Sequence, residues 1–263
     1  MGPAPGPAYD RIGVGYSRVR RPEPSWQRAI DAALAGCATV ANVGAGAGSY
    51  EPAGRTVAAL EPSAVMVAQR PAGAAPAARA VAEALPLVDG ALDAALVVLS
   101  LHHWSDWRAG LAELRRTSRH QVIVTFDDDE HAGLWLIDEY LPGIMDLDLN
   151  LPPSPTAVAE ALGGGVVTTL PVPHDCADGI LWAGWRRPER YLDPAVLAAA
   201  SSTAALPAAE RDQGIERLRA DLASGAWHRR HADLLDQEEI DGGFRLVVAG
   251  GSDDSGGREE TTP

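Results

Sequence analysis

The stretch Val40-Ala41-Asn42-Val43-Gly44-Ala45-Gly46-Ala47-Gly48-Ser49-Tyr50 decides the fold of this chain. It begins with mainly small apolar residues, which are typical of a buried parallel strand. Three glycines at alternate positions follow, and glycine accepts a positive φ and leaves the backbone open to a ligand. Such a turn before a helix suits a carboxylate or another negatively charged group. Its spacing differs from the dinucleotide-binding G-x-G-x-x-G motif and from the P-loop.

Further strands follow this turn at regular intervals. The second strand ends at Glu61, an acid at the position where a nucleotide ribose presents its two hydroxyls. The fourth strand is almost wholly apolar, as expected for a strand that helices cover on both faces. The predicted strands are residues 40–43, 56–60, 77–81, 92–100, 121–126, 166–172 and 244–249.

This succession resembles the class I S-adenosylmethionine-dependent methyltransferases, and within them the small-molecule branch of ubiquinone/menaquinone C-methyltransferase-like enzymes. The resemblance covers roughly residues 38–127 and implies an α/β, Rossmann-like, doubly wound sheet of seven strands, mostly parallel with an antiparallel last strand. It also implies S-adenosylmethionine as the cofactor. The chain departs from the family at Asn42 and Val81, where an acid is usual. The resembling motifs are Asn42-Val-Gly-Ala-Gly-Ala-Gly48, Leu60-Glu-Pro-Ser-Ala-Val-Met66, Ala82-Glu-Ala-Leu-Pro86 and Leu101-His-His-Trp104.

The resemblance also assigns a cofactor site to the ends of these strands. The three glycines cradle the cofactor, Glu61 binds its ribose, and Asn42 can still form a hydrogen bond. Because Val81 cannot bind the adenine amino group, the backbone around Ala82 and the side chain of Glu83 take that role. The predicted cofactor-binding residues are Tyr16, Asn42, Gly44, Ala45, Gly46, Gly48, Glu61, Pro62, Met66, Ala82, Glu83, Leu99 and Ser100.

Composition narrows the class of substrate. The net charge of −14 disfavours nucleic acid as a partner, because phosphates would be repelled. All 22 basic residues are arginine and alanine is abundant, which indicates a bacterial genome of high GC content. Cys37 and Cys176 lack metal-ligand spacing and fit a reducing cytoplasm. With no predicted signal peptide or membrane span, we expect a cytoplasmic protein, either a monomer or a homodimer, that acts on a small molecule.

The second half of the chain carries a large helical insertion. We expect disordered ends at residues 1–8 and 251–263, and one methyltransferase domain over residues 9–250. About residues 174–242 separate the last two strands as a cap rich in aromatic residues, where ligands of such folds bind. Ser25 is the expected N-cap of the first helix. The predicted helices are residues 25–35, 131–141, 155–162, 180–185, 194–200, 208–224 and 229–238.

Three histidines are candidates for a general base, which a methyl acceptor needs only if it must lose a proton. His174 follows the sixth strand beside Asp175, and His102 and His103 follow the fourth. The acids at residues 127–130 are expected to stabilise a helix N-terminus rather than bind a metal, so no metal is predicted. A cofactor-binding protein without transferase activity is the alternative function. The predicted acceptor-binding residues are His103, Trp104, Asp127, Trp182, Trp185 and Tyr191.

Overall fold

A single seven-stranded sheet organises the chain, whose computed structural model describes residues 19–127, 133–147 and 151–251. The strand order is β3-β2-β1-β4-β5-β9-β6, and β9 alone runs antiparallel to its neighbours β5 and β6. The predicted fold class is therefore confirmed. The strands are β1 Val40–Val43, β2 Thr56–Leu60, β3 Ala77–Ala78, β4 Leu92–Val98, β5 Ser118–Phe126, β6 Val166–Thr169 and β9 Phe244–Gly250.

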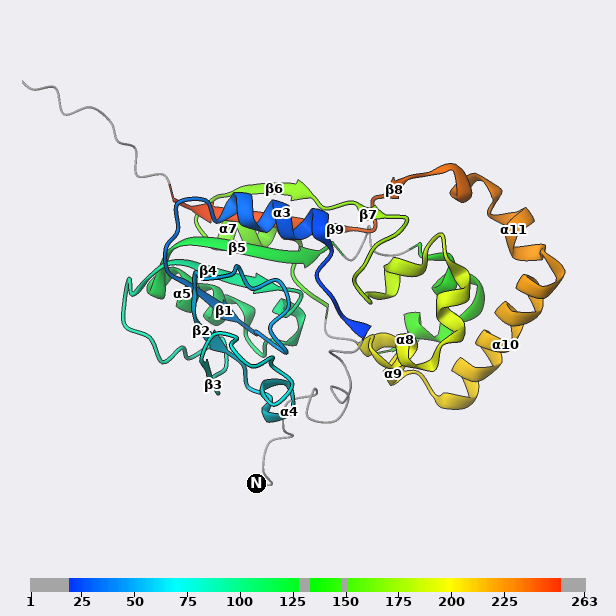
Figure 1. The fold of residues 1–263 in the computed structure, drawn as a ribbon, viewed down its shortest axis with the longest axis horizontal. Helices are drawn as coiled ribbons and strands as arrows, with labels where there is room; N and C mark the ends of the chain where they lie inside the picture. Colours follow the sequence, from blue (N-terminus) through cyan, green and yellow to red (C-terminus); the bar gives the residue numbers. More distant parts are fainter. Residues whose placement is uncertain (1–18, 128–132, 148–150, 252–263) are drawn as a thin grey trace, which may run out of the picture.

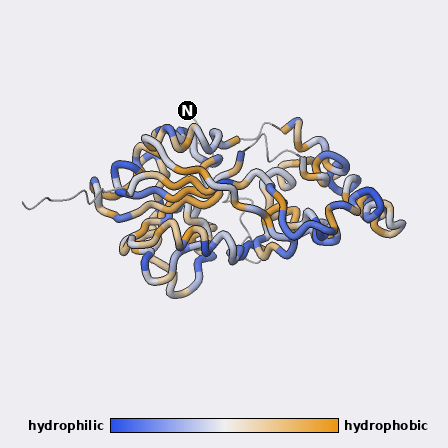
Figure 2. Tube along the Cα trace, turned by 90° about the horizontal axis from the view of Figure 1, so that it is seen from above, coloured by the Kyte–Doolittle hydropathy of each residue, from blue (hydrophilic) through white to orange (hydrophobic). Residues whose placement is uncertain are grey.

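Helices cover both faces of the sheet, and the strand side chains alternate between them. On β4, Leu96 joins the core beneath α3 (Pro24–Ala33), whereas Val97 joins the core beneath α5 (Trp107–Thr117) and α7 (Pro155–Ala161). A short helix, α4 (Ala64–Val67), follows β2. The apolar strands form the hydrophobic centre seen in Figure 2. This two-sided burial explains why the strand sequences are nearly continuous apolar runs.

Helix starts follow local chemistry, with one correction to the sequence prediction. Glu23, and not Ser25, is the N-cap of α3, because its carboxylate accepts a hydrogen bond from the Ser25 backbone N–H at 3.0 Å. Pro24 then occupies the first helical turn, where its missing N–H costs nothing. The carboxylate of Asp106 caps α5 by accepting from the Arg108 and Ala109 amides.

The predicted sixth strand is broken into two. Strand β6 ends at Thr169, and Pro171, which has no N–H to donate, follows shortly after. The chain then forms β7 (Val172–Pro173), which pairs with β8 (Glu239–Ile240) in a separate two-stranded sheet. The predicted third strand is also shorter, with only two residues paired in β3.

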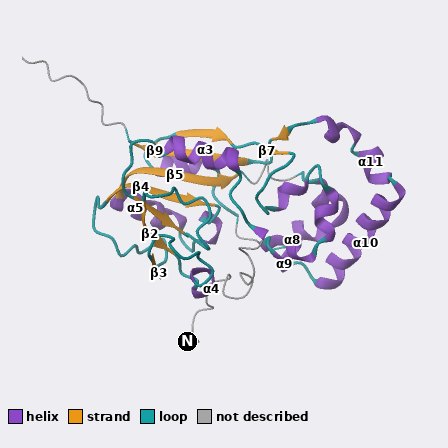
Figure 3. Cartoon of the chain, in the orientation of Figure 1, coloured by secondary structure: helices purple, strands orange, loops and turns teal. Residues whose placement is uncertain are grey.

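Between β7 and β8 lies a group of helices, short except for α10 (Ala208–Ser224), at the carboxyl ends of the parallel strands (Figures 1 and 3). A second segment after β5 packs with them: a π-helical turn, η2 (Leu136–Tyr140), and η3 (Pro142–Asp146). The predicted helix at residues 131–141 is thus a π-turn in its described part. We call residues 133–147 and 174–240 together the cap. Its other elements are η4 Leu181–Gly184, η5 Pro188–Leu192, α8 Pro194–Ala198, α9 Ser201–Ala205, α10 Ala208–Ser224, α11 Ala226–Arg230 and η6 Ala232–Asp236.

None of the helices in the described ranges is sufficiently long and apolar to cross a lipid bilayer.

Candidate functional site

The glycine turn, residues 44–48, connects β1 to the rest of the site. Gly44, Gly46 and Gly48 have φ values of 69°, 51° and 93°, which other residues rarely adopt. The Gly44 N–H donates to the Leu60 carbonyl at 2.8 Å, which fixes the turn against the end of β2. A Cβ on Gly44 would lie 2.6 Å from the Ser100 Cβ, so this glycine allows β1 and β4 to end side by side. A Cβ on Gly46 would lie 3.2 Å from the Met66 Cε.

Glu61 fixes the shape of this turn. Its Oε2 accepts a hydrogen bond from the Gly46 N–H at 2.8 Å, and its Oε1 accepts one from the Ser63 N–H at 2.8 Å. The side chain is buried, so these charge-assisted bonds act in a region of low dielectric. Each carboxylate oxygen has a second lone pair, which can accept from a ribose hydroxyl.

Asn42 belongs to a buried polar group beside the turn. Its Nδ2 donates to Glu51 Oε1 at 3.1 Å, and Glu51 forms a two-bond ion pair with Arg70, both at 2.8 Å. A Cβ on Gly48 would lie 3.2 Å from Arg70 Nη1, so the pair packs directly against the third glycine. The Asn42 Oδ1 is buried and has no hydrogen-bond partner. An unsatisfied buried acceptor of this kind suits a ligand that donates to it.

The end of β4 places both histidines at the carboxyl edge of the sheet. Leu99 has a φ of 49°, an unusual value for a residue with a side chain, and it turns the chain into η1 (Leu101–His103). The His102 and His103 rings lie 3.8 Å apart between centroids, and His102 lies 5.2 Å from Phe126 at the end of β5. His103 keeps part of its surface exposed, yet the atoms around its imidazole desolvate the ring and lower its pKa to about 4, so the ring is neutral at pH 7.

The residues predicted to surround adenine differ in burial and in what they contact. Ala82 is buried, whereas Val81 is half exposed. Glu83 Oε1 accepts from the Ser105 and Asp106 backbone amides at 2.7 and 3.1 Å, and so anchors the loop before α5. Although burial raises the pKa of Glu83, hydrogen bonds from Asp106 and Ser105 outweigh it and lower that pKa overall. Trp104 packs on α5, where a Cβ on Gly110 would lie 2.6 Å from its Cζ3 atom.

The aromatic residues of the cap are mostly buried, in a core that the cap shares with the α3 face of the sheet. Trp185 and Tyr191 are fully buried, and their polar atoms bond to the Pro173 and Leu181 carbonyls at 3.3 and 2.6 Å. Trp182 is 5% exposed in the same core. These side chains therefore hold the cap together, and the pocket-lining role predicted for them stays a prediction.

His174 lies in the turn directly after β7, rather than with His102 and His103 after β4. Its Nδ1 contacts the Glu238 backbone carbonyl at 3.2 Å and the Glu238 carboxylate at 3.3 Å. Asp127 follows β5, and its backbone N–H donates to the Gly243 carbonyl at 2.8 Å. The two ends of the chain, Tyr16 and residues 128–131 lie outside the described residues. The described residues contain no group of three or more His, Cys, Asp or Glu that could hold a metal ion.

Comparison with known proteins agrees with this geometry. The sequence profile of the methyltransferase domain family matches residues 36–126. The structure matches that of an Anabaena variabilis protein, described as a methyltransferase from an antibiotic biosynthesis pathway, with a TM-score of 0.77. The two are 30% identical over 84% of this chain and 96% of that one. This chain belongs to the class I S-adenosylmethionine-dependent methyltransferases.

More distant matches add only the fold. A Thermotoga maritima S-adenosylmethionine-dependent methyltransferase is 20% identical, with a TM-score of 0.50 over 62% of this chain and 84% of that one. No curated protein is significantly similar to the chain. The cofactor of this methyltransferase is S-adenosylmethionine, as predicted from the sequence. The ubiquinone/menaquinone-like branch stays a prediction.

The residues present fit this cofactor. The open glycine turn faces Glu61, whose second lone pairs suit ribose hydroxyls, and the cofactor ammonium could donate to the unsatisfied Asn42 Oδ1. Glu51 places a carboxylate directly beside Asn42, the position where the family usually has an acid, and Arg70 pairs with that carboxylate. An amide at position 42 therefore suits this methyltransferase, because it can donate to the neighbouring Glu51 carboxylate where an ionised acid could not.

Restoring the family's usual acid is consequently expected to harm this methyltransferase. Asn42→Asp puts a second carboxylate about 3 Å from Glu51, so one of the two must take up a proton in the folded state. The shared raised pKa makes the folded state bind more protons than the unfolded state, so stability falls as the pH rises through that pKa. We expect the melting temperature of Asn42→Asp to fall below that of the wild type progressively between pH 5 and pH 8. Equal melting curves at pH 8 would contradict this account, and Asn42→Ala is the control for loss of the amide alone.

Sequence reasoning missed four contributors to the site region. Glu51 and Arg70 have no motif, because their pairing depends on chain segments that meet only in the fold. Tyr50 follows the glycine turn, and its φ of 64° could not be predicted because tyrosine rarely adopts a positive φ. Phe126 was assigned only as the end of a strand, although the predicted parallel order of the β4 and β5 ends would have placed it beside His102.

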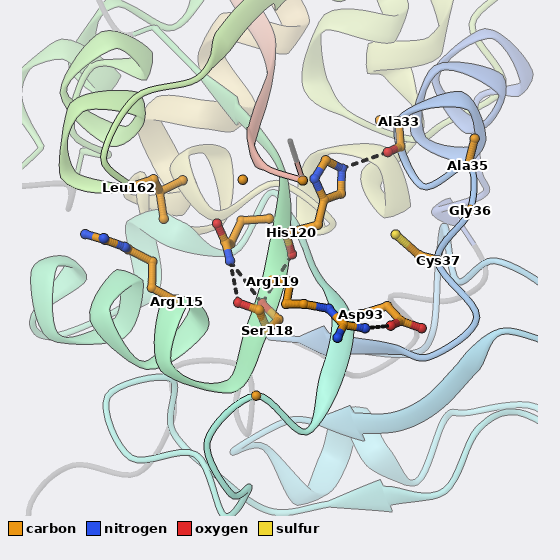
Figure 4. A pocket seen from close by; sticks show the side chains of 14 residues that line it. Ala33, Ala35, Gly36, Cys37, Asp93, Arg115, Ser118, Arg119, His120 and Leu162 are labelled. Atoms are coloured by element: carbon orange, nitrogen blue, oxygen red, sulfur yellow. Dashed lines mark hydrogen bonds and ion pairs between the residues drawn. The ribbon is translucent and has the colours of Figure 1, made fainter. Parts of the chain in front are cut away.

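A separate cavity of about 730 Å³ lies at the opposite edge of the sheet, between α3 and the start of β5 (Figure 4). Its lining includes Arg119, which is already paired with Asp93, and His120, whose Nε2 donates to the Ala33 carbonyl at 2.8 Å. No predicted site residue lines it, so it is distinct from the cofactor site.

Proposed function

We propose that this methyltransferase methylates an O, N or C atom of a small aromatic or natural-product-like molecule in secondary metabolism. The observation that carries the proposal is the similarity to the Anabaena variabilis protein, which is described as belonging to an antibiotic biosynthesis pathway. The two are 30% identical, and the match covers 84% of this chain and 96% of that one. The net charge of −14 further disfavours a nucleic-acid acceptor.

The acceptor in this proposal lies between the ends of β4 and β5 and the cap. His102 and Phe126 present aromatic rings there, and Asp127 follows directly. An aromatic acceptor can pack on these rings with an offset or edge-to-face geometry. Bound S-adenosylmethionine supplies an electrophilic methyl group, and the protein's task is to align the acceptor atom with it and exclude water. Alignment of this kind can lower a barrier by roughly 7–11 kcal/mol.

His103 is the base in this proposal for acceptors that must lose a proton, because it lies beside His102 at the carboxyl edge of the sheet, where the acceptor is proposed to bind. Its imidazole is neutral at pH 7, so a ring nitrogen can accept the proton of a phenol as the new bond forms. His174, the first candidate from sequence, remains in the proposal as the alternative, although its ring already contacts Glu238.

Isotope transfer tests the function directly. Incubation of the protein with methyl-labelled S-adenosylmethionine and a panel of phenols, indoles, amines and polyketides should label at least one acceptor. Calorimetric binding of the cofactor without transfer to any member of the panel or to bacterial extracts would instead favour the non-methylating alternative.

Variants of the two histidines then distinguish the bases. With a phenolic acceptor, His103→Ala should lower turnover by about 100-fold or more and leave cofactor affinity within a factor of two. With an already nucleophilic amine, the loss should be much smaller, because no proton must leave before attack. If His174→Ala shows the large phenol-specific loss instead, the base is His174.

A further inference from the structure

A buried polar junction joins three segments that are far apart in the sequence. The Tyr50 hydroxyl, directly after the glycine turn, donates to Asp178 Oδ2 at 2.8 Å, and Asp178 lies in the first loop of the cap. Arg20, from the N-terminal segment, donates to both carboxylate oxygens of Asp178, with Nη2 at 3.1 Å from Oδ2. The same Tyr50 hydroxyl accepts from the Glu23 backbone N–H at 2.9 Å.

The junction lies in the protein interior, which makes its bonds costly to lose. Asp178 is 0% exposed and Tyr50 is 1% exposed. Burial and the neighbouring Asp178 raise the pKa of Tyr50 well above its usual range, so the hydroxyl stays protonated and donates. A buried carboxylate that loses a donor remains charged in a medium of low dielectric. The Tyr50–Asp178 bond therefore constrains both segments that it joins.

The backbone of Tyr50 shows that this constraint acts on the cofactor turn. A φ of 64° lies in the left-handed region, which a tyrosine adopts only when its surroundings hold it there. Here the ring packs on Trp26 at 6.4 Å between centroids, and Asp178 fixes the hydroxyl. The side chain thus maintains the conformation in which the chain leaves the glycine turn.

The cap is held equally firmly at the other end of the bond. The Ala177 backbone N–H donates to Glu23 Oε2 at 2.9 Å. On the other side of Asp178, a Cβ on Gly179 would lie 2.6 Å from the Val19 carbonyl oxygen, so the N-terminal segment contacts the cap loop without a gap. The first loop of the cap is therefore fixed on both sides of Asp178.

We propose that Tyr50 and Asp178 are positioning residues that couple the cofactor turn to the cap. In this arrangement, cofactor bound at the glycine turn restrains the cap over the acceptor site, and the cap in turn stabilises the cofactor-binding conformation of the turn. Coupling of binding free energies is reciprocal, so the effect is measurable from the cofactor side alone.

The chain contains a matched control for this proposal. The Tyr140 hydroxyl donates to Asp221 Oδ2 at 2.7 Å and accepts from Arg230 Nη2 at 2.6 Å. This second Tyr–Asp–Arg group has the same chemistry, but all of its members lie within the cap. Asp221 and Arg230 are more exposed than Asp178, and Tyr140→Phe removes a hydroxyl with the same bonding pattern without cutting a link to the glycine turn.

Hydrogen exchange of the full chain with and without S-adenosylhomocysteine tests the coupling. In the wild type, the ligand should slow exchange both at residues 44–50 and across residues 174–240. In Tyr50→Phe, ligand affinity should fall about 3- to 10-fold, and at saturation the cap should lose more than half of its ligand-induced protection while the turn keeps its own. Asp178→Asn should behave similarly, and Tyr140→Phe should behave like the wild type.

Two results with the variants would overturn the proposal: unchanged cap protection in Tyr50→Phe, or equal loss of protection in Tyr140→Phe. A wild-type cap that does not respond to the ligand would overturn it as well. Thermal melting of each variant checks that it is folded before exchange is compared. Because the experiment uses only binding of the product nucleoside, it is independent of which acceptor is methylated.

Discussion

Replacement of Glu61 by alanine is expected to weaken S-adenosylmethionine binding at least 100-fold. The substitution removes the acceptor for the Gly46 and Ser63 backbone amides, and in our account it also removes the acceptor for the ribose hydroxyls. Hydrogen bonds to a charged group contribute about 1.5–3 kcal/mol each, and about 2.8 kcal/mol corresponds to a 100-fold change in affinity. The variant therefore loses both the hydrogen bonds that fix the shape of the glycine turn and the proposed contact with the ribose.

Calorimetry with S-adenosylhomocysteine measures this effect. Asp93→Asn is the control, because Asp93 is an acid at the opposite edge of the sheet, where it accepts from the Thr39 backbone N–H at 2.9 Å and pairs with Arg119. That variant should bind nearly as well as the wild type. An affinity of Glu61→Ala within threefold of the wild-type value would show that Glu61 has only a structural role in the turn.

The part of the fold that could be predicted is the part that local sequence determines. The apolar runs of β1, β4 and β5, the glycines of the turn and the acid that ends β2 are all visible within a few consecutive residues. Family resemblance supplied the antiparallel last strand, which no local pattern around Phe244 reveals. The strand break at Pro171 could have been predicted, since a proline cannot donate to a sheet ladder.

The parts that could not be predicted depend on contacts between distant segments. A tryptophan in a cap has the same sequence signature whether it lines a pocket or packs in a core. The full burial of Trp185 could therefore not be predicted from the sequence. The ion pair of Glu51 and Arg70 and the junction of Arg20 with Asp178 likewise join residues with no shared motif. Sequence reasoning also treated the segment after β5 as separate from the cap, although the two share one core.

Trp135 shows why that shared core matters. It comes from the segment after β5, and its Nε1 donates to the Trp185 carbonyl oxygen at 2.8 Å. Its ring lies edge-on to Trp227 at 5.0 Å and to Tyr191 at 5.4 Å between centroids. One side chain therefore joins the two chain segments of the cap through its hydrogen bond and its ring contacts.

Trp135→Ala is accordingly expected to destabilise the protein by about 3–5 kcal/mol, through the cavity it leaves and the lost hydrogen bond. For a chain of this size, that corresponds to a melting temperature lower by roughly 6 °C or more. Trp135→Phe, which keeps an aromatic ring but loses the indole N–H, should have a melting temperature between those of Trp135→Ala and the wild type.

Trp107→Ala is the control, at a half-buried tryptophan on α5 whose ring lies 4.0 Å from the Arg108 guanidinium carbon. It should lower the melting temperature less than Trp135→Ala does. Because the hydrogen bond and ring contacts of Trp135 are with cap residues and not with the glycine turn, the folded fraction of Trp135→Ala should still bind S-adenosylhomocysteine. If melting shows no greater loss for Trp135→Ala than for Trp107→Ala, the cap does not depend on this side chain.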